Sequence, residues 1–250
     1  MTSPEPPALS LPSLWPSAGL TRQGVGRSVN EDAILSRPDL GLWAVADGIG
    51  GQAAGDVASR AVIGALAGAL ESAGPQQSLD AAAAVVRGAL TTVNRELLDK
   101  AAQLGTRSVI ATTIAMLLVR GDEALCLWAG DSRIYLLRDV HLYRLTRDHT
   151  VAADRMMAGL PPSPDPRAAQ SLTRAVGARD ALTLDLAVLG TRPGDLFLVC
   201  TDGVWQAIPP EGLAGSFEAD PDATVRLLAE RALAGGTRDD LSAVVTRVCP

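Results

Sequence analysis

Two long alanine-rich segments with helical spacing interrupt a series of short apolar runs, and this order restricts the fold more than any other feature. Residues 53–73 and 79–103 repeat apolar residues at helical spacing, and Ser78 stands where a helix N-cap belongs. Strands and helices do not alternate singly, as they would in a doubly wound parallel sheet. We therefore expect an α+β fold in which two antiparallel sheets pack face to face with helices outside. The expected strands are 33–36, 41–46, 112–120, 124–129, 133–138, 141–145, 182–189, 195–201 and 241–248, with further helices at 150–159 and 222–234.

Composition is consistent with a single domain that has a substantial core. Hydrophobic residues make up 47% of the 250 residues but aromatic residues only 3%, so Ala, Val and Leu must fill the interior. Residues 1–18 are rich in proline and lack the charged and apolar regions of a signal peptide, so we expect a flexible lead. Because no linker or internal repeat is visible, residues 19–250 are expected to form one domain.

Charge and cysteine usage exclude several classes of protein. The formal net charge is −6, and no run of Lys or Arg exceeds two residues, which argues against a nucleic-acid binder. Three widely spaced cysteines and two histidines do not form a zinc motif. No stretch of about 18 apolar residues lacks a charge or glycine, so no membrane span is expected. These features indicate a cytoplasmic protein.

Carboxylates gather where the expected strands end or begin. Asp47, Asp131 and Asp202 each follow an apolar run, and Asp239 and Asp240 directly precede the last strand. Carboxylates brought together repel one another unless a cation compensates them, and oxygen ligands suit Mg²⁺ or Mn²⁺. Asp-Gly is also a common turn dipeptide, so each motif alone would indicate only a turn. Their joint order, with Arg27 and the Asn-Glu-Asp run at 30–32 upstream, favours a metal centre.

A series of short motifs runs in a fixed order between residues 20 and 248. They are GVGRSVNEDA at 24–33, LWAVADGIGGQAAGDVASR at 42–60, ATT at 111–113, LWAGDSRIYLLRD at 127–139, LTRDHT at 145–150, LTRAVG at 172–177, PGDLFLVCTDGVW at 193–205 and GTRDDLSAVV at 236–245. Together they resemble the PPM family of metal-dependent protein phosphatases (type 2C), especially its compact bacterial members. The resemblance implies a central β-sandwich of two antiparallel sheets flanked by pairs of helices, in four layers αββα.

The resemblance also implies how two Mn²⁺ or Mg²⁺ ions are held. Asp47 would bridge both ions, and the carbonyl of Gly48 would complete one coordination shell. Asp202 and Asp239 would hold the other ion, whereas Glu31 would act through a metal-bound water.

Further positions receive roles from the same resemblance. Arg27 matches the residue that grips the substrate phosphate, which suits its planar fork of donors. Asp131, together with Asp202, matches the site of a third, weaker metal. Asp32 would support the metal-bound waters, and Asp240 stands beside the ligand Asp239 where asparagine is usual. His149 is interpreted as a structural residue of its loop rather than a catalytic base.

The implied reaction is direct attack on phosphorus by a metal-bridged hydroxide, without a phosphoenzyme. Substrates would be phosphoserine and phosphothreonine in proteins, and the partner would be a cognate Ser/Thr kinase of a bacterial cell. A monomer is expected. Residues 151–170 correspond to the family's variable flap, and the segment 42–60 resembles phosphatases of type VI secretion loci.

Two alternatives from other classes compete with this interpretation. A phosphatase-fold regulatory module would bind a phosphoprotein with little or no turnover, but such a module should lack a metal ligand or the phosphate-gripping arginine. A metal-dependent nuclease would need a basic track for its substrate, and none is visible.

Overall fold

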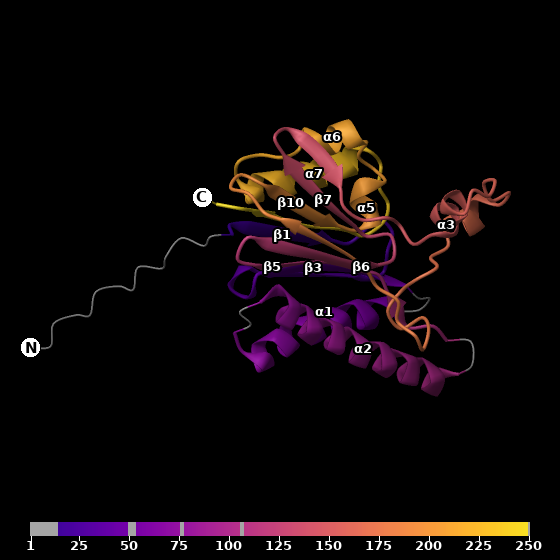
Figure 1. Ribbon diagram of the computed structural model, residues 1–250. Coiled ribbons are helices and arrows are strands. Elements are labelled where there is room, and N and C mark those ends of the chain that lie inside the picture. The colour runs from indigo at the N-terminus through magenta and orange to yellow at the C-terminus, as the bar shows by residue number, and fades with distance from the viewer. Residues whose placement is uncertain (1–14, 50–53, 76–77, 106–107, 250) are drawn as a thin grey trace, which may run out of the picture.

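The structure, a computed structural model, describes residues 15–49, 54–75, 78–105 and 108–249, and its strands form two antiparallel sheets packed face to face (Figure 1). Neighbouring strands in both sheets run antiparallel. The first sheet has the order β1 (Ser17–Arg22), β11 (Leu241–Arg247), β10 (Leu196–Cys200), β7 (Arg133–Arg138), β8 (His141–Arg144). The second has the order β2 (Asp32–Arg37), β3 (Leu42–Ile49), β5 (Ile114–Arg120), β6 (Glu123–Ala129), β9 (Asp185–Gly190), and β4 (Ala111–Thr112) pairs with β3.

Helices cover the outer face of each sheet, so the expected αββα layering is confirmed. Helices α1 (Gly55–Ala73) and α2 (Leu79–Leu104) lie on the second sheet, and α5 (Asp202–Trp205), α6 (Pro210–Ala214) and α7 (Pro221–Ala234) lie on the first (Figure 1). The short helices α3 (Val151–Met157) and α4 (Pro166–Ala169) project from one end of the sandwich (Figure 1). None of the described helices is long and apolar enough to cross a membrane.

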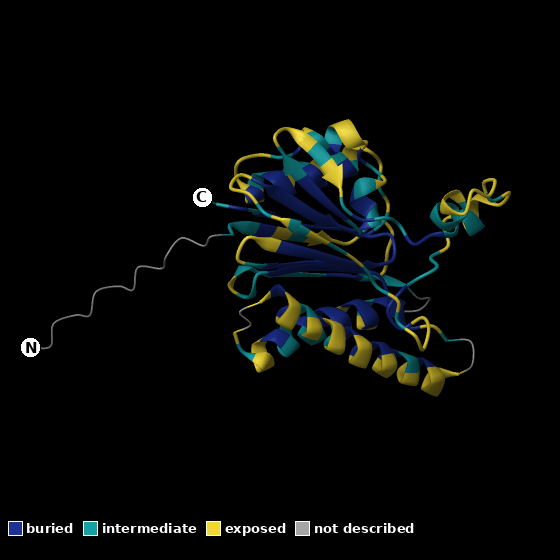
Figure 2. Cartoon of the chain, in the orientation of Figure 1, coloured by how far each residue is buried: buried dark blue, intermediate teal, exposed yellow. Residues whose placement is uncertain are grey.

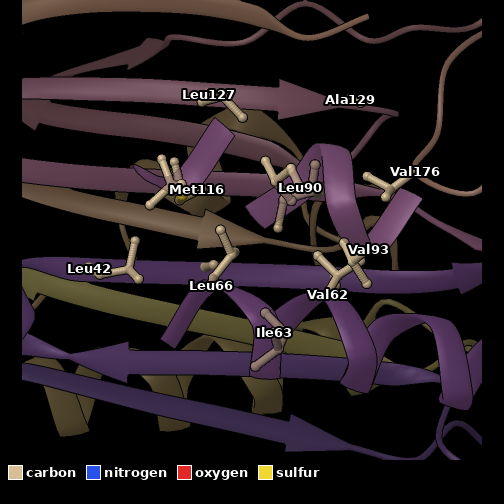
Figure 3. Packing of buried hydrophobic residues seen from close by; sticks show 14 of the residues in the cluster. Leu42, Val62, Ile63, Leu66, Leu90, Val93, Met116, Leu127, Ala129 and Val176 are labelled. Carbon is tan, nitrogen blue, oxygen red and sulfur yellow. The ribbon is translucent and has the colours of Figure 1, made fainter. Parts of the chain in front are cut away.

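Three apolar clusters hold the four layers together. Leu66 and Leu90 from the two long helices pack with Met116 on the second sheet (Figure 3). Trp43 and Phe197 meet between the sheets, and both are fully buried. A third cluster joins the first sheet to α5, α6 and α7. The inner strands are consequently dark in Figure 2, whereas the edge strands β1, β8 and β9 and the outer helix surfaces carry exposed residues. This burial makes the sandwich a rigid support for the loops at its ends.

Several elements differ from those expected from the sequence. Strand β1 was missed because SAGLTR has no apolar run, and its first residues overlap the range expected as a flexible lead. Residues 1–14 of that lead lie outside the described part of the chain. Strand β3 continues to Ile49, so Asp47 and Gly48 lie within a strand rather than in a turn after it. Helix α4 was not among the helices expected from the sequence; it begins at Pro166, because proline is compatible with the first helical position.

Candidate functional site

The predicted carboxylates come from both sheets and meet at one end of the sandwich. Asp32, at the start of β2, lies directly opposite Asp47 near the end of β3. The hydroxyl of Thr201, which follows β10 in the other sheet, donates to Asp32 Oδ2 at 2.9 Å. Asp32 is buried, so this hydrogen bond links the two sheets beside the carboxylate pair.

The backbone of Asp47 is fixed by two threonines. The Thr113 amide donates to the Asp47 carbonyl at 2.8 Å, and the Asp47 amide donates to Thr113 Oγ1 at 3.0 Å. The hydroxyl of Thr112 donates to the same carbonyl at 2.9 Å. Because the backbone N–H and C=O of Asp47 are both hydrogen-bonded, the backbone that carries its carboxylate is held in place near the end of the strand.

The segment before β11 brings two more carboxylates to this end of the sandwich. Asp240 is buried, and its two oxygens accept the amide hydrogens of Gly24 at 2.7 Å and Glu31 at 2.8 Å. It therefore anchors the loop that carries Arg27 and Glu31. Asp239 accepts the Asp240 amide at 2.9 Å through Oδ1, and the same oxygen forms an ion pair with Arg27.

Electrostatics show that the acidic groups lie close enough to repel one another. Burial, followed by the charges of Asp32, Asp202, Asp131 and Asp239, raises the pKa of Asp47 well above its usual value. Burial and then the charge of Asp239 raise the pKa of Asp202 to about 6. Bringing buried carboxylates together lowers the stability of the fold. Groups of carboxylates with raised pKa values are therefore typical of functional sites.

Asp131 also has a raised pKa, and hydrogen bonds link its segment to the second sheet and to α5. Burial, and then the charge of Asp202, raise the pKa of Asp131 to about 7. The indole nitrogen of Trp205 donates to the Asp131 carbonyl at 3.1 Å. The next residue, Ser132, forms a hydroxyl–hydroxyl bond of 2.8 Å with Thr113. Asp131 is thus connected to the threonine that holds Asp47.

Arg27 lies at the edge of this acidic group and forms ion pairs with two of its members. Its guanidinium pairs with Asp239 and, at 3.5 Å, with Glu31, and its side chain is 41% exposed. A half-exposed guanidinium at the edge of an acidic cluster can exchange these carboxylates for a phosphate. Like a carboxylate, a phosphate can accept two parallel hydrogen bonds from the guanidinium.

His149 forms structural hydrogen bonds and is completely buried. Its Nδ1 accepts the Gly130 amide at 3.1 Å, and its Nε2 contacts Asp185 Oδ2 at 3.1 Å. The ring stacks on Trp128 with centroids 6.1 Å apart. Both ring nitrogens are engaged, which agrees with the interpretation of His149 as a structural residue.

The donors at this end of the sandwich suit a hard divalent cation. Asp47, Asp202 and Asp239, with the backbone carbonyl of Gly48, offer only oxygen atoms, and their charges repel one another as described above. Among the described residues, no group of three or more His, Cys, Asp or Glu side chains is arranged so that it could hold a metal ion. Mg²⁺ and Mn²⁺ sites that retain waters need few protein ligands, so the residues present fit such ions better than Zn²⁺.

Several residues that hold the site were not found from the sequence. Thr113 and Thr201 position Asp47 and Asp32, and Gln206 donates to Asp202 Oδ2 at 2.9 Å. Gln206 lies four residues after Asp202, which is a helical spacing that would have indicated the contact if α5 had been expected. The threonines gave no comparable signal, because their partners lie far away in the sequence.

Comparison with known proteins agrees with the fold and the motifs. A sequence model of the protein phosphatase 2C family matches residues 22–243. The chain is 30% identical to the serine/threonine protein phosphatase PstP of Mycobacterium tuberculosis over 92% of its own length, but it spans only 44% of that relative. It is 28% identical to a serine/threonine phosphatase of Listeria monocytogenes, with 76% of this chain and 77% of the relative covered.

Two solved structures are similar along nearly the whole chain. PppA, described as a key regulatory component of the T6SS in Pseudomonas aeruginosa, is 38% identical with a TM-score of 0.85, and the match covers 93% of this chain and 97% of PppA. The catalytic domain of PstP in complex with two manganese ions is 30% identical with a TM-score of 0.80, over 94% and 99% of the two chains. The chain therefore belongs to the protein phosphatase 2C family.

Proposed function

We propose that this chain is a metal-dependent phosphatase that hydrolyses phosphoserine and phosphothreonine in proteins. The observation that carries the proposal is the group of carboxylates with raised pKa values at one end of the sandwich, with Arg27 at its edge. Family membership supports the same activity, although the chain spans about half the length of the first relative it matches.

We propose the following roles for the residues of the candidate site in metal binding. Asp47, Asp202 and Asp239 would hold two divalent cations, with the Gly48 carbonyl as a further donor and Glu31 acting through water. When bound, the cations supply a Lewis acid and an activated water for direct attack on phosphorus. Manganese is the proposed ion, because the related PstP structure contains two manganese ions.

The remaining site residues would act on the substrate phosphate or on their neighbours. Arg27 would leave its ion pair with Asp239 and bind the phosphate through its guanidinium. Asp32, held by Thr201, would accept hydrogen bonds from bound water, and Asp240 would keep the Arg27 loop in place. Asp131 and Asp202 would form the site of a third ion.

The cellular setting is also part of the proposal. The substrates would be proteins phosphorylated by a cognate Ser/Thr kinase in the cytoplasm, where three free cysteines would stay reduced. The similarity to PppA favours a role in regulation. We further propose that residues 19–250 act as one monomeric catalytic domain with a flap at 151–170.

Turnover of a phosphothreonine peptide tests the proposal. Phosphate release should require added Mn²⁺, stop with EDTA, and fall at least about 100-fold in Asp202→Asn, because a ligand charge is lost. Asp122→Asn is the matched control, since Asp122 lies exposed in the turn between β5 and β6. Metal-bound, folded protein without turnover would instead support the regulatory-module alternative.

A further inference from the structure

Strand β9 forms an edge of the second sheet, and this edge has no role in the chemistry proposed above. Among the described strands, β9 pairs only with β6. Its residues Ala187 and Leu189 pack between the sheets, so Leu186 and Val188 point to the opposite face, which bears the helices. These two side chains are 52% and 55% exposed. The strand contains no Lys or Pro, which commonly protect an edge from pairing with another strand.

The backbone groups on the free edge belong to the same two residues. In an antiparallel ladder, opposite residues alternate between pairs that exchange hydrogen bonds and pairs that do not. Thr191 lies opposite Asp122 just beyond the ladder, and its amide donates to the Asp122 carbonyl at 2.7 Å. The odd-numbered residues of β9 therefore bond to β6. The amide and carbonyl groups of Leu186 and Val188 consequently face away from β6.

A neighbouring contact agrees with this alternation. The carbonyl of Gly190 faces the free edge and accepts a hydrogen bond from Arg138 at 2.8 Å. In the described part of the chain, the backbone groups of Leu186 and Val188 make no hydrogen bond outside the β6–β9 ladder. Two amides and two carbonyls are thus available to an added strand.

A groove of about 390 Å³ lies along this edge, between β9 and the first turns of α2. Leu79 and Leu125 form its buried floor. Leu186 and Val188, together with the exposed Ala84 of α2, form walls that a ligand can reach. The groove can therefore receive the apolar side chains that an added strand would direct toward the helix layer.

Two charged residues of α2, Asp80 and Arg87, also line the groove. Both are exposed, and neither forms an ion pair with another described residue. Seven residues of helix separate them by about 10 Å. Further along α2, Asn94 accepts the Gly177 amide at 2.7 Å, and the residue before Gly177 pairs with Thr112 at the acidic site. Arg87 therefore lies nearer to the acidic site than Asp80 does.

We propose that this groove binds an extended segment of the phosphoprotein substrate, which adds to β9 as a further strand. The segment would carry apolar residues at alternate positions, a basic residue beside Asp80 and an acidic residue beside Arg87. Its backbone would form up to four hydrogen bonds with Leu186 and Val188, and its side chains would provide specificity. The inference rests on the proposed phosphatase function and adds a docking site at a distance from the phosphate.

The position of β9 favours the substrate as the occupant, because the strand begins near the acidic site. Asp185, its first residue, lies opposite Trp128, and Asp131 follows Trp128 by three residues. Three residues of strand and two strand spacings are about 10 Å each, so about 14 Å separates the docked segment from Asp131. Four or five extended residues cover this distance. We therefore expect the segment about five or more residues from the phosphorylated residue.

Fluorescence anisotropy measures docking without a phosphate. The probe is the fluorescein-labelled peptide Lys-Thr-Val-Thr-Val-Thr-Glu. The control peptide Lys-Thr-Val-Val-Thr-Thr-Glu has the same composition, but its adjacent valines point to opposite faces of a strand. With the full chain in EDTA, the alternating peptide should bind at least about tenfold more tightly. Equal affinities, or no binding of either peptide, would overturn the docking site.

Turnover tests whether the substrate is the occupant. Each segment is joined at its Glu end to a phosphothreonine through a Gly-Ser linker of about five residues. With Mn²⁺, the alternating segment should lower KM about tenfold and leave kcat nearly unchanged, because docking stabilises the bound substrate and the transition state equally. Equal KM values for the two substrates would overturn the assignment of the groove to the substrate.

Single substitutions locate the effect on β9 and α2. Val188→Lys places a charge on the free edge and should abolish the preference for the alternating segment. Val140→Lys makes the same change in the turn between β7 and β8, where Val140 is 89% exposed, and should keep the preference. Arg87→Glu should weaken binding of the alternating peptide at least about twofold. A preference that survives in Val188→Lys would overturn the proposal.

Hydrolysis of p-nitrophenyl phosphate, which has no peptide segment, reports on the metal centre separately. If this hydrolysis fails with Mn²⁺ while the alternating peptide still binds, the phosphatase proposal is overturned and the groove remains a peptide-docking site. If hydrolysis proceeds but neither peptide is preferred, only the docking site is overturned.

Discussion

Gly48 lies where the end of β3 approaches the start of α1, and an added methyl group there should be costly. A Cβ atom at Gly48 would lie 2.2 Å from the Gly55 carbonyl oxygen and 2.7 Å from that of Glu31. Because ordinary contacts begin at 3.4 Å, the strand and helix would have to separate by about 1.2 Å. Both obstructing atoms are backbone, so no side-chain rotation can relieve the contact.

We expect Gly48→Ala to lower the free energy of unfolding by about 3 kcal/mol, the upper end for overpacking, and Tm by about 6–12 °C. The separation would also stretch the 3.1 Å hydrogen bond from the Gly48 amide to the Glu31 carbonyl. The assay is urea denaturation in EDTA, which keeps metal binding out of the measurement.

The control is Gly64→Ala on the exposed face of α1, where an added Cβ meets nothing within 4 Å. This change should stabilise the protein by about 0.5–1 kcal/mol, because alanine is the better helix former. If Gly48→Ala cost less than about 0.5 kcal/mol, the close approach of β3 and α1, and the placement of Glu31 beside them, would be wrong.

Three further predictions follow from single contacts. Asp195→Ala should cost about 3 kcal/mol in urea denaturation, because it leaves Arg138 without the buried carboxylate that it contacts at 2.6 and 2.8 Å; a cost below about 1 kcal/mol would contradict this. Burial lowers the pKa of His149, although the contact with Asp185 opposes this effect. The unfolded chain therefore binds a proton more readily than the folded protein, so acid destabilises the fold. The stability advantage of wild type over His149→Gln should be full above pH 6.5 and shrink as the pH falls below it. An advantage that stays constant from pH 7.5 to 5.5 would refute this reasoning. Arg27→Ala should lower kcat/KM for a phosphothreonine peptide by about 100-fold, with Arg27→Lys recovering only part; equal activity of Arg27→Ala and wild type would remove Arg27 from phosphate binding.

The long helices and the layer order could be predicted because their signals are local. The Ser78 hydroxyl accepts the Ala81 amide at 3.2 Å, as expected of an N-cap, and Val86, Leu90 and Leu97 are buried at helical spacing. Strand β1 could not be predicted in this way. It pairs with β11 at the other end of the chain, and that pairing rather than its own residues makes it a strand.

In the candidate site, too, the residues in local sequence motifs could be predicted, whereas contacts between distant residues could not. Motif order indicated the carboxylates, yet their supports depend on contacts across the chain. The bond from Thr201 to Asp32 joins residues 169 positions apart, and the bond from Gly24 to Asp240 spans 216 positions. The structure gives Asp240 a specific role, because both of its carboxylate oxygens accept backbone amide hydrogens. No periodicity or spacing in the sequence reports such pairs.

Binding of Mn²⁺ to the metal-free chain tests most directly whether the acidic cluster is a two-metal centre. Isothermal titration calorimetry of wild type, Asp47→Asn and the exposed control Asp122→Asn gives the number of ions bound. We predict at least two ions per chain for wild type and Asp122→Asn, and loss of binding in Asp47→Asn, since Asp47 is proposed to contact both ions. Unchanged binding in Asp47→Asn, or no binding by wild type, would contradict the account.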